Sequence, residues 1–417
     1  MATASTRMAQ RSFFALLGAN FFSAMGNSFT MLAIPLYVLE TTISATRTGI
    51  VAFANTSPAI LSAIIGGPLV DRLGRKRTAI TSDLLSMITL GCIPLLAKLD
   101  LLTFPLLLVI VAMGAVFDPP GGSAKQAMVP ILSRKADYSP ERAQSFFTVT
   151  FGVSQIIGPA FAGVLVATIG AAGTIWVNCG TFALTILLIS LFVYGGESPN
   201  ERTTSTFVQD LRGGWESVLR DDFLRTVMII SAAFSGIFVP IYTVLYPVYF
   251  TEIMDSTKAL GLFIGVEAGG SLLGGILYGV FGARFSRRNA MAFCLIAWVP
   301  ALWIFLLSPP LSVLLVAGFL GGLVAGPLNP IFNVAFQVRT PESMRARIYG
   351  IAMASNFVAV PLGALLMGPL IQILSVLPAL GLLSVVVTVM CVWAAFRPVL
   401  RELDLPPAQD EAAQAPS

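Results

Sequence analysis

Twelve long apolar segments constrain this chain more than any other feature of its sequence. A helix needs about 20 apolar residues to cross a hydrocarbon core about 30 Å thick, and the twelve segments match that requirement. Hydrophobic residues make up 56% of the 417 residues and charged residues only 11%, which is not the composition of a soluble domain. The sequence therefore predicts an all-α membrane protein with twelve transmembrane helices. The segments lie at 12–39, 46–70, 78–97, 101–123, 144–168, 173–194, 223–250, 259–281, 289–307, 311–335, 347–374 and 377–396.

Residues that commonly build catalytic or metal sites are scarce in this chain. Histidine, the commonest metal ligand and general base, is absent. The four cysteines, Cys92, Cys179, Cys294 and Cys391, each lie alone inside an apolar segment, so their spacing fits neither a metal site nor a disulfide framework. The acidic residues are scattered, and the GxxxxGK[ST] pattern of nucleotide-binding loops does not occur. These observations disfavour a membrane-embedded enzyme and an ATP-driven pump, and we expect no cofactor and no nucleic-acid partner.

The distribution of basic residues predicts the orientation of the helices. If both termini are cytoplasmic, Arg47, Lys98 and Lys258 are the basic residues that face outward, which leaves 22 of the 25 Lys and Arg residues inside. This asymmetry follows the positive-inside rule. We therefore expect a multi-pass protein of the plasma membrane, the inner membrane in a bacterium, with both termini in the cytoplasm.

An internal repeat divides the chain into two halves. A shift of 212 residues aligns similar residues from the two halves, which is typical of a duplicated bundle. The expected domains are a six-helix bundle at 1–195, a cytoplasmic linker with a short surface helix at 196–222, a second six-helix bundle at 223–401, and a disordered tail at 402–417. The aligned residues are Pro35, Tyr37, Glu40, Gly67, Arg72, Arg75 and Lys76 with Pro247, Tyr249, Glu252, Gly279, Arg284, Arg287 and Arg288.

The turn between the second and third segments carries a recognisable motif. Its sequence, Gly67-x-x-x-Asp71-Arg72-x-Gly74-Arg75-Lys76, resembles the signature loop of the major facilitator superfamily. The opening GANFFSAMGNSFTMLAIPLYVLETTISATRTG and the later VPILSRKADYSPERAQSF look most like the branch that holds macrolide-efflux and catecholate-siderophore exporters. The resemblance implies a secondary transporter with two pseudo-symmetric six-helix bundles.

The resemblance also implies a conformational latch. In the family, the aspartate matching Asp71 holds the start of helix 11, and the arginine matching Arg75 pairs with an acid low on helix 4, which here is Asp118. The second copy has Ala283 in place of Asp71 and no acidic residue between Glu267 and Glu342, so we expect the latch to be one-sided. The residues assigned to it are Gly67, Asp71, Arg72, Gly74, Arg75, Lys76 and Asp118.

Ionisable residues inside apolar segments are functional candidates, because a charge at membrane depth is costly. Glu267 lies about eight residues into the eighth segment, roughly 12 Å along a helix, and we assign it to proton coupling or cation recognition. The alternative is a carboxylate wetted by the outer mouth of a cavity or bonded to a neighbouring helix. Asp83 is a second candidate, for which structural pairing with a Lys or Arg is the alternative. Lys125 is expected to mark the inner end of the fourth helix.

Neutral polar residues supply the candidates for a substrate cavity. Each of them has the alternative of a hydrogen bond between helices, and the tyrosines have the alternative of an interfacial belt. Many family members carry an acid where this chain has Asn27. The candidates are Asn20, Asn27, Asn55, Gln155, Tyr242, Tyr246, Asn329, Asn333 and Asn356.

Together these features predict a monomeric secondary transporter that exports a small, largely apolar or amphipathic compound, such as a drug or a siderophore, by alternating access. Proton-coupled antiport is the expected energy source, with the small-molecule substrate and membrane lipids as the expected partners. The alternatives are an importer or a lipid or lysolipid transporter of the same fold, or a non-transporting membrane sensor.

Overall fold

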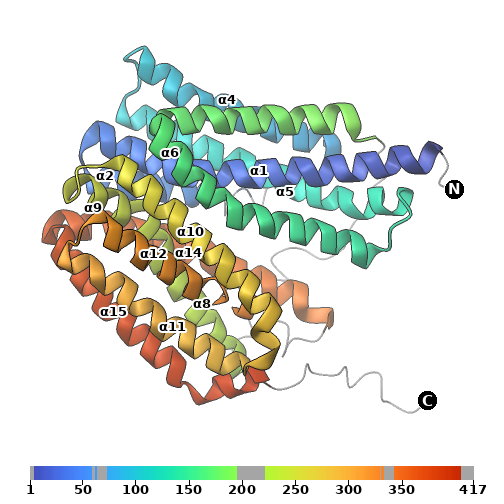
Figure 1. The fold of residues 1–417 in the computed structure, drawn as a ribbon. Coiled ribbons are helices and arrows are strands. Elements are labelled where there is room, and N and C mark those ends of the chain that lie inside the picture. Colours follow the sequence, from blue (N-terminus) through green and yellow to red (C-terminus); the bar gives the residue numbers. More distant parts are fainter. Residues whose placement is uncertain are drawn as a thin grey trace. The chain divides into compact units, whose positions relative to one another are not determined.

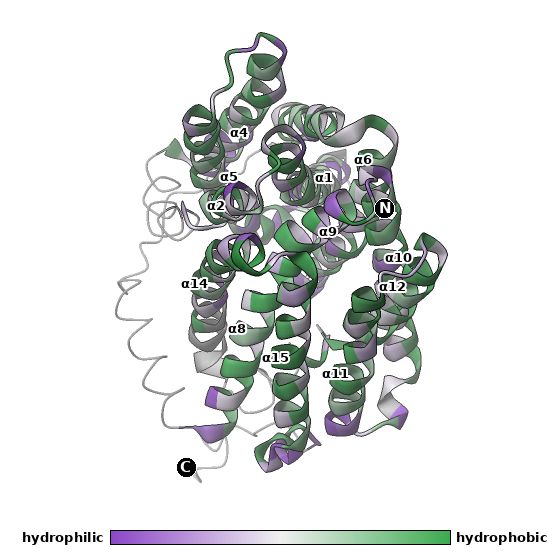
Figure 2. Ribbon diagram, turned by 90° about the vertical axis from the view of Figure 1, so that its left-hand side faces the viewer, coloured by the Kyte–Doolittle hydropathy of each residue, from purple (hydrophilic) through white to green (hydrophobic). Residues whose placement is uncertain are grey.

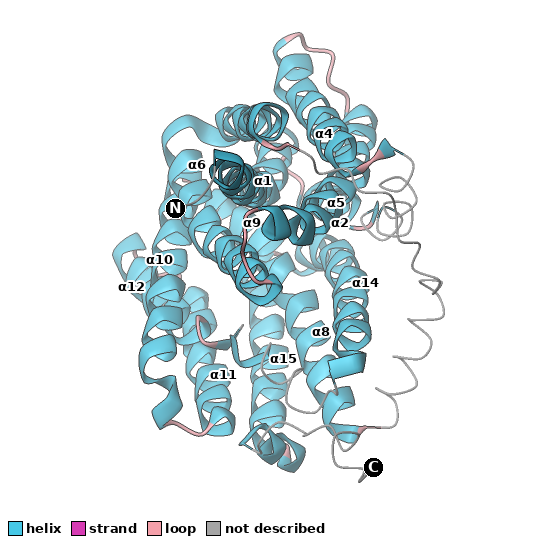
Figure 3. Cartoon of the chain, turned by 90° about the vertical axis from the view of Figure 1, so that its right-hand side faces the viewer, coloured by secondary structure: helices cyan, strands magenta, loops and turns pink. Residues whose placement is uncertain are grey.

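The computed structural model describes residues 4–58, 62, 73–194, 221–328, 330–332 and 342–404. Within these ranges the regular structure is entirely helical, without strands (Figure 3). Several predicted features lie outside them: the loop residues Gly67, Asp71 and Arg72, the cavity candidates Asn329 and Asn333, most of the linker at 196–222, and most of the tail.

The first half of the chain forms long helices that pack side by side (Figure 1). Helix α6 contains both the fifth and the sixth predicted segments, and it breaks at Gly170, whose φ of +74° is a left-handed value that glycine adopts without strain. Helix α1 packs against α5 and α6, and α4 packs against the same two helices. The helices are α1 (Ala4–Thr42), α2 (Ala45–Thr56), α4 (Arg75–Lys98), α5 (Phe104–Lys135) and α6 (Pro140–Phe192).

The second half begins where Asp221 caps α8 by accepting hydrogen bonds from the backbone N–H groups of Phe223 and Leu224. The seventh predicted segment is divided into α8, a single π-helical turn and α9, next to Pro240 and Pro247. The elements are α8 (Asp222–Pro240), η1 (Ile241–Leu245), α9 (Tyr246–Glu252), α10 (Thr257–Phe281), η2 (Gly282–Arg284), α11 (Arg287–Trp303), η3 (Ile304–Leu307), α12 (Leu311–Ala325), α14 (Glu342–Leu374), α15 (Val376–Phe396) and η4 (Pro398–Asp404).

The helices follow the twelve predicted segments in order, and the prediction of an all-α membrane fold is confirmed. Within the described ranges, nine helices or helical runs are long and apolar enough to cross a membrane. Hydrophobic residues cover most of each helix, and hydrophilic residues gather at helix ends and loops (Figure 2). The chain divides into two compact units, Met1–Thr203 with Ser256–Gly261 and Thr204–Asp255 with Leu262–Ser417.

Candidate functional site

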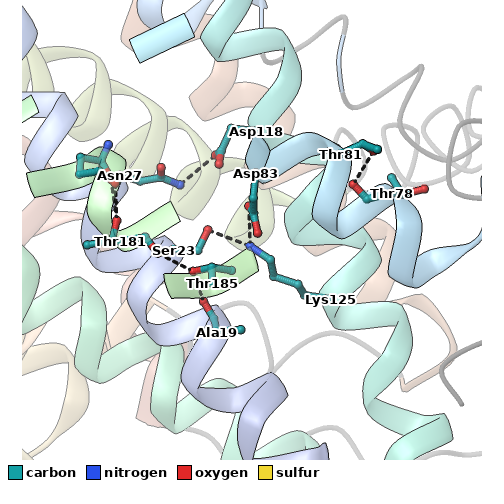
Figure 4. Close-up of polar contacts among 11 residues, drawn as sticks. Ala19, Ser23, Asn27, Thr78, Thr81, Asp83, Asp118, Lys125, Thr181 and Thr185 are labelled. Atoms are coloured by element: carbon teal, nitrogen blue, oxygen red, sulfur yellow. Dashed lines mark hydrogen bonds and ion pairs between the residues drawn. The ribbon is translucent and has the colours of Figure 1, made fainter. Parts of the chain in front are cut away.

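A buried ion pair lies inside the first unit (Figure 4). The ammonium group of Lys125 on α5 lies 2.9 Å from Oδ1 of Asp83 on α4, and it donates a second hydrogen bond of 2.9 Å to the hydroxyl of Ser23 on α1. The side chains of Lys125 and Asp83 are only 1% and 0% exposed. The prediction that Lys125 marks the inner end of its helix is therefore wrong, because α5 continues to Lys135 and the lysine is the buried partner of Asp83.

Asp118 lies on α5 close to this pair, at the start of a Pro119-Pro120 step (Figure 4). Its Oδ2 accepts a hydrogen bond of 2.8 Å from the side-chain amide of Asn27 on α1. The expected ion pair between Asp118 and Arg75 is not formed within the described residues. The hydrogen-bond partner of the Asp118 carboxylate is therefore the neutral side chain of Asn27, and not the guanidinium group of Arg75.

The prolines that follow Asp118 leave a backbone carbonyl group without its helical donor. Pro120 has no N–H group, so the carbonyl oxygen of Val116 four residues earlier loses its hydrogen bond in the helix. The hydroxyl of Ser62 donates to this oxygen at 2.6 Å. The side chain of Ser62 therefore replaces the missing donor at this carbonyl group of α5.

The part of the signature loop that the structure describes lies at the beginning of α4. Gly74 is the N-cap residue and has a φ of +83°, as the tight turn requires. The ammonium group of Lys76 donates to the carbonyl oxygens of Ser190 and Val193 at 3.1 and 2.8 Å. These carbonyls lie at the carboxyl end of α6, where a positive charge is favourable.

The loop before α11 is the counterpart of the signature loop in the second half of the chain, and we call it the second loop. A carboxylate from η4 contacts this loop. Asp404 of η4 accepts a hydrogen bond of 2.6 Å from the hydroxyl of Ser286, the N-cap residue of α11, and one of 3.4 Å from the backbone N–H of Arg288. The guanidinium group of Arg287 donates to the carbonyl oxygen of Leu403 at 3.3 Å. The sequence did not predict this contact, because Asp404 lies 118 positions after Ser286.

A third group of polar residues joins α1 to α6. The buried side-chain amide of Asn178 donates to the hydroxyl of Thr30, and Thr181 donates to Oδ1 of Asn178 at 2.9 Å. The hydroxyl of Thr185 donates to the carbonyl oxygen of Ala19 at 3.3 Å. These contacts join helices within the first unit.

In the second unit, the carboxyl group of Glu267 lies among tyrosines. The Glu267 side chain is 3% exposed, and the hydroxyl of Tyr242 is its side-chain hydrogen-bond partner. Within the part of the chain that the structure describes, no Lys or Arg forms an ion pair with Glu267, and its Oε2 has no hydrogen-bond partner. A charged carboxylate here would thus lack the compensation that Lys125 gives to Asp83.

Aromatic rings continue from Tyr242 into a packed cluster. The ring of Tyr246 lies 5.3 Å from that of Tyr242, 5.1 Å from that of Phe263 and 5.2 Å from that of Phe305, as measured between ring centroids. Tyr246, Phe263 and Phe305 are at most 2% exposed, so their rings are covered by one another. The half-buried ring of Tyr242 lies at the edge of this cluster, next to Glu267.

Helix α12 holds the backbone of α10 at Glu267. A Cβ atom added at Gly322 of α12 would collide with the backbone carbonyl oxygen of Glu267 and approach the backbone N of Ser271. Only a glycine permits two helix backbones to approach this closely. Gly322 thereby permits α12 to pack directly against the backbone of α10 at Glu267, a contact that the sequence did not predict.

Residues 16–270 and 241–416 match the model of the Major Facilitator Superfamily, so the matched regions together cover most of the chain. The chain belongs to the major facilitator superfamily. This membership agrees with the family expected from the signature loop, and it identifies the protein as a membrane transporter rather than an enzyme.

The relatives of this superfamily member include exporters of the expected branch. The multidrug efflux pump Tap of Mycolicibacterium fortuitum is 34% identical over 399 residues, covering 94% of this chain and 96% of that protein. The enterobactin exporter EntS of Citrobacter koseri is 24% identical over 363 residues, covering 86% of this chain and 85% of EntS. The crystal structure of the nucleoside transporter NupG has the same fold, with a TM-score of 0.71, 14% identity, and coverage of 95% of this chain and 99% of NupG.

The remaining candidates of this major facilitator protein lie on four helices, α1, α2, α6 and α14. Asn20 is buried on α1, and its Nδ2 has no hydrogen-bond partner in the described ranges. Asn55 on α2 and Asn356 on α14 are half-buried, and Gln155 on α6 is exposed. No cluster of His, Cys, Asp and Glu that could hold a metal ion occurs among the residues that the structure describes.

Proposed function

We propose that this transporter exports small amphipathic cations in exchange for protons, with Glu267 as the group that binds either one. The observation that carries the proposal is a carboxyl group at membrane depth that is buried without a cationic partner in the described ranges and is bonded to Tyr242. The names of the relatives Tap and EntS support export.

The chemistry of the site accounts for coupling. A carboxylate buried in an apolar environment needs a positive charge, and either a proton or the cationic group of a substrate provides it. The half-buried ring of Tyr242, next to Glu267, adds aromatic surface for the apolar part of a substrate. Because a single carboxylate cannot bind both at once, release of the substrate on one side accompanies uptake of a proton there, which is exchange.

The proposal also covers the orientation, the oligomeric state and the energy source of the transporter. We place both termini in the cytoplasm of the cell, because the basic residues then follow the positive-inside rule. The transporter would act as a monomer in the plasma membrane, use the proton gradient without a cofactor, and move its substrate by alternating access.

The test uses purified protein in liposomes with an imposed pH gradient. Ethidium serves as the cationic probe and fluorescein as the anionic probe of similar size. We expect the wild type to accumulate ethidium and not fluorescein, and Glu267→Gln to abolish gradient-driven accumulation. Glu252→Gln is the matched control, because Glu252 is an exposed carboxylate at the end of α9 in the same unit.

Two outcomes would contradict the proposal. Equal ethidium accumulation by wild type and Glu267→Gln, with the same pH dependence, would show that another group couples transport. A preference for fluorescein would show that the substrate is not a cation.

A further inference from the structure

We propose that Asp118 is a second proton-binding site, so that the transporter exchanges two protons for each monovalent cation. The inference rests on the proposed proton-coupled export and adds its stoichiometry. It starts from the geometry around Asp118, whose carboxylate accepts a hydrogen bond from the neutral Asn27 side chain.

The ammonium group of Lys125 forms its ion pair with Asp83. This group lies 2.9 Å from Oδ1 of Asp83 and 2.9 Å from the hydroxyl of Ser23, and both charged side chains are fully buried. Asp118 lies close to both charged groups (Figure 4). The lysine therefore neutralises Asp83 and leaves Asp118 without a cationic partner among the described residues.

No other charged group compensates Asp118 among the described residues. Helix α1 presents the neutral Asn27 to it, α4 presents Asp83, and α5 itself carries Lys125. The hydroxyl of Ser62 donates to the backbone of α5 and not to the carboxylate. With both carboxyl groups ionised the cluster has a net charge of −1, and one proton on Asp118 brings it to zero.

The position of Asp118 suits proton exchange better than that of Asp83. Asp118 lies near the middle of α5, at the proline break, and its side chain is half-buried, whereas Asp83 is fully buried. An uncompensated charge at this depth is unfavourable, so Asp118 gains from binding a proton whenever water reaches it. The transferred species is a proton alone, which converts the carboxylate to the carboxylic acid and is released by the reverse step.

Inside the apolar helices, each unit therefore holds one carboxyl group without a cationic partner in the described ranges, Asp118 in the first and Glu267 in the second. Exchange of two protons for one monovalent cation moves one net positive charge across the membrane in each cycle. Exchange through Glu267 alone would be electroneutral. A membrane potential therefore drives the exchange of two protons for one cation, and it does not drive the exchange of one proton for one cation.

The test measures ethidium uptake by liposomes at equal pH on both sides, with a lumen-positive potential set by potassium and valinomycin. A potential of about 100 mV acting on one net charge supports about 50-fold accumulation by the wild type, against the direction of passive ethidium movement. We expect Asp118→Asn, which retains a side chain of the same shape, to lose this potential-driven accumulation and to respond to the pH gradient alone. Asp100→Asn is the control, because Asp100 is exposed and its positive φ is one that asparagine tolerates.

A second measurement does not depend on transport. An infrared pH titration of the purified protein detects the C=O stretch of protonated carboxyl groups, and we expect one titrating band to disappear in Asp118→Asn and another in Glu267→Gln.

The inference is overturned if wild type responds to the pH gradient and not to the potential, if Asp118→Asn keeps the potential response, or if that variant loses no titrating band. Absence of ethidium uptake under both gradients would instead overturn the proposed export itself, and the stoichiometry with it.

Discussion

In the first unit the buried carboxyl group of Asp83 lies 2.9 Å from the ammonium group of Lys125, whereas in the second unit the buried carboxyl group of Glu267 faces the hydroxyl of Tyr242. The first arrangement is a closed ion pair, because each charge meets the opposite charge inside the protein. The second leaves the carboxyl group without a cationic partner among the described residues, and in our proposal a proton or a cationic substrate neutralises it. The difference teaches that burial of a carboxyl group does not by itself indicate proton coupling. A buried carboxyl group is a candidate for coupling when no Lys or Arg side chain neutralises it.

The largest expected effect comes from breaking the ion pair of the first unit. Lys125→Met leaves Asp83 buried without a cation, which costs about 3–5 kcal/mol of stability in comparable cases. We expect a marked decrease in the unfolding temperature of the purified protein, and partial recovery in the double variant Lys125→Met, Asp83→Asn.

The control for this prediction is Lys98→Met, because Lys98 is exposed at the end of α4. If Lys125→Met unfolds at the wild-type temperature, the pair does not stabilise the first unit, and the contrast between the two units is lost.

The next effect concerns the backbone contact that positions Glu267. Gly322→Ala introduces a Cβ atom that collides with the carbonyl oxygen of Glu267, and overpacking of this kind costs about 1–3 kcal/mol. We expect lower stability and slower ethidium transport. Gly269→Ala is the matched control, because a Cβ atom there meets no neighbour within 4 Å. Similar behaviour of the two variants would show that α12 does not hold Glu267 in place.

A smaller effect is expected to distinguish Tyr242 from Tyr246. Tyr242→Phe removes the hydroxyl that bonds Glu267, and a single hydrogen bond contributes about 0.5–1.5 kcal/mol, more when one partner is charged. We expect the pH dependence of ethidium transport to shift in Tyr242→Phe and to change little in Tyr246→Phe, whose ring still packs on Phe263 and Phe305. An unshifted pH profile in Tyr242→Phe would remove this tyrosine from the coupling site.

The smallest effect compares the two loops of the internal repeat. Asp404→Asn weakens the contact with Ser286 and with the N–H of Arg288 at the start of α11, and a negative charge at a helix N-terminus contributes about 0.3–1 kcal/mol. We expect faster hydrogen exchange in the first turn of α11 and none of this change in the first turn of α4. Unchanged exchange in α11 would show that Asp404 does not stabilise the second loop.

The sequence by itself determined the fold and the family. Hydropathy is a property of each segment, so the twelve apolar segments predicted the helices without knowledge of their neighbours. The signature loop is likewise local, and it indicated the superfamily that the comparison then showed. Glu267 was predicted as a functional candidate from its depth within an apolar segment, and its role stays a prediction.

Only the tertiary structure decided which polar residues meet. Asp83 and Lys125 are 42 positions apart, Asn27 and Asp118 are 91, and Ser286 and Asp404 are 118. The physical reason is that a contact between helices depends on which face each helix turns to its neighbour, and almost any rotation of an apolar helix fits the same hydropathy. Helix packing therefore placed Asn27, and not Arg75, beside Asp118, and it placed Lys125 inside the bundle, where a lysine is stable because Asp83 neutralises it.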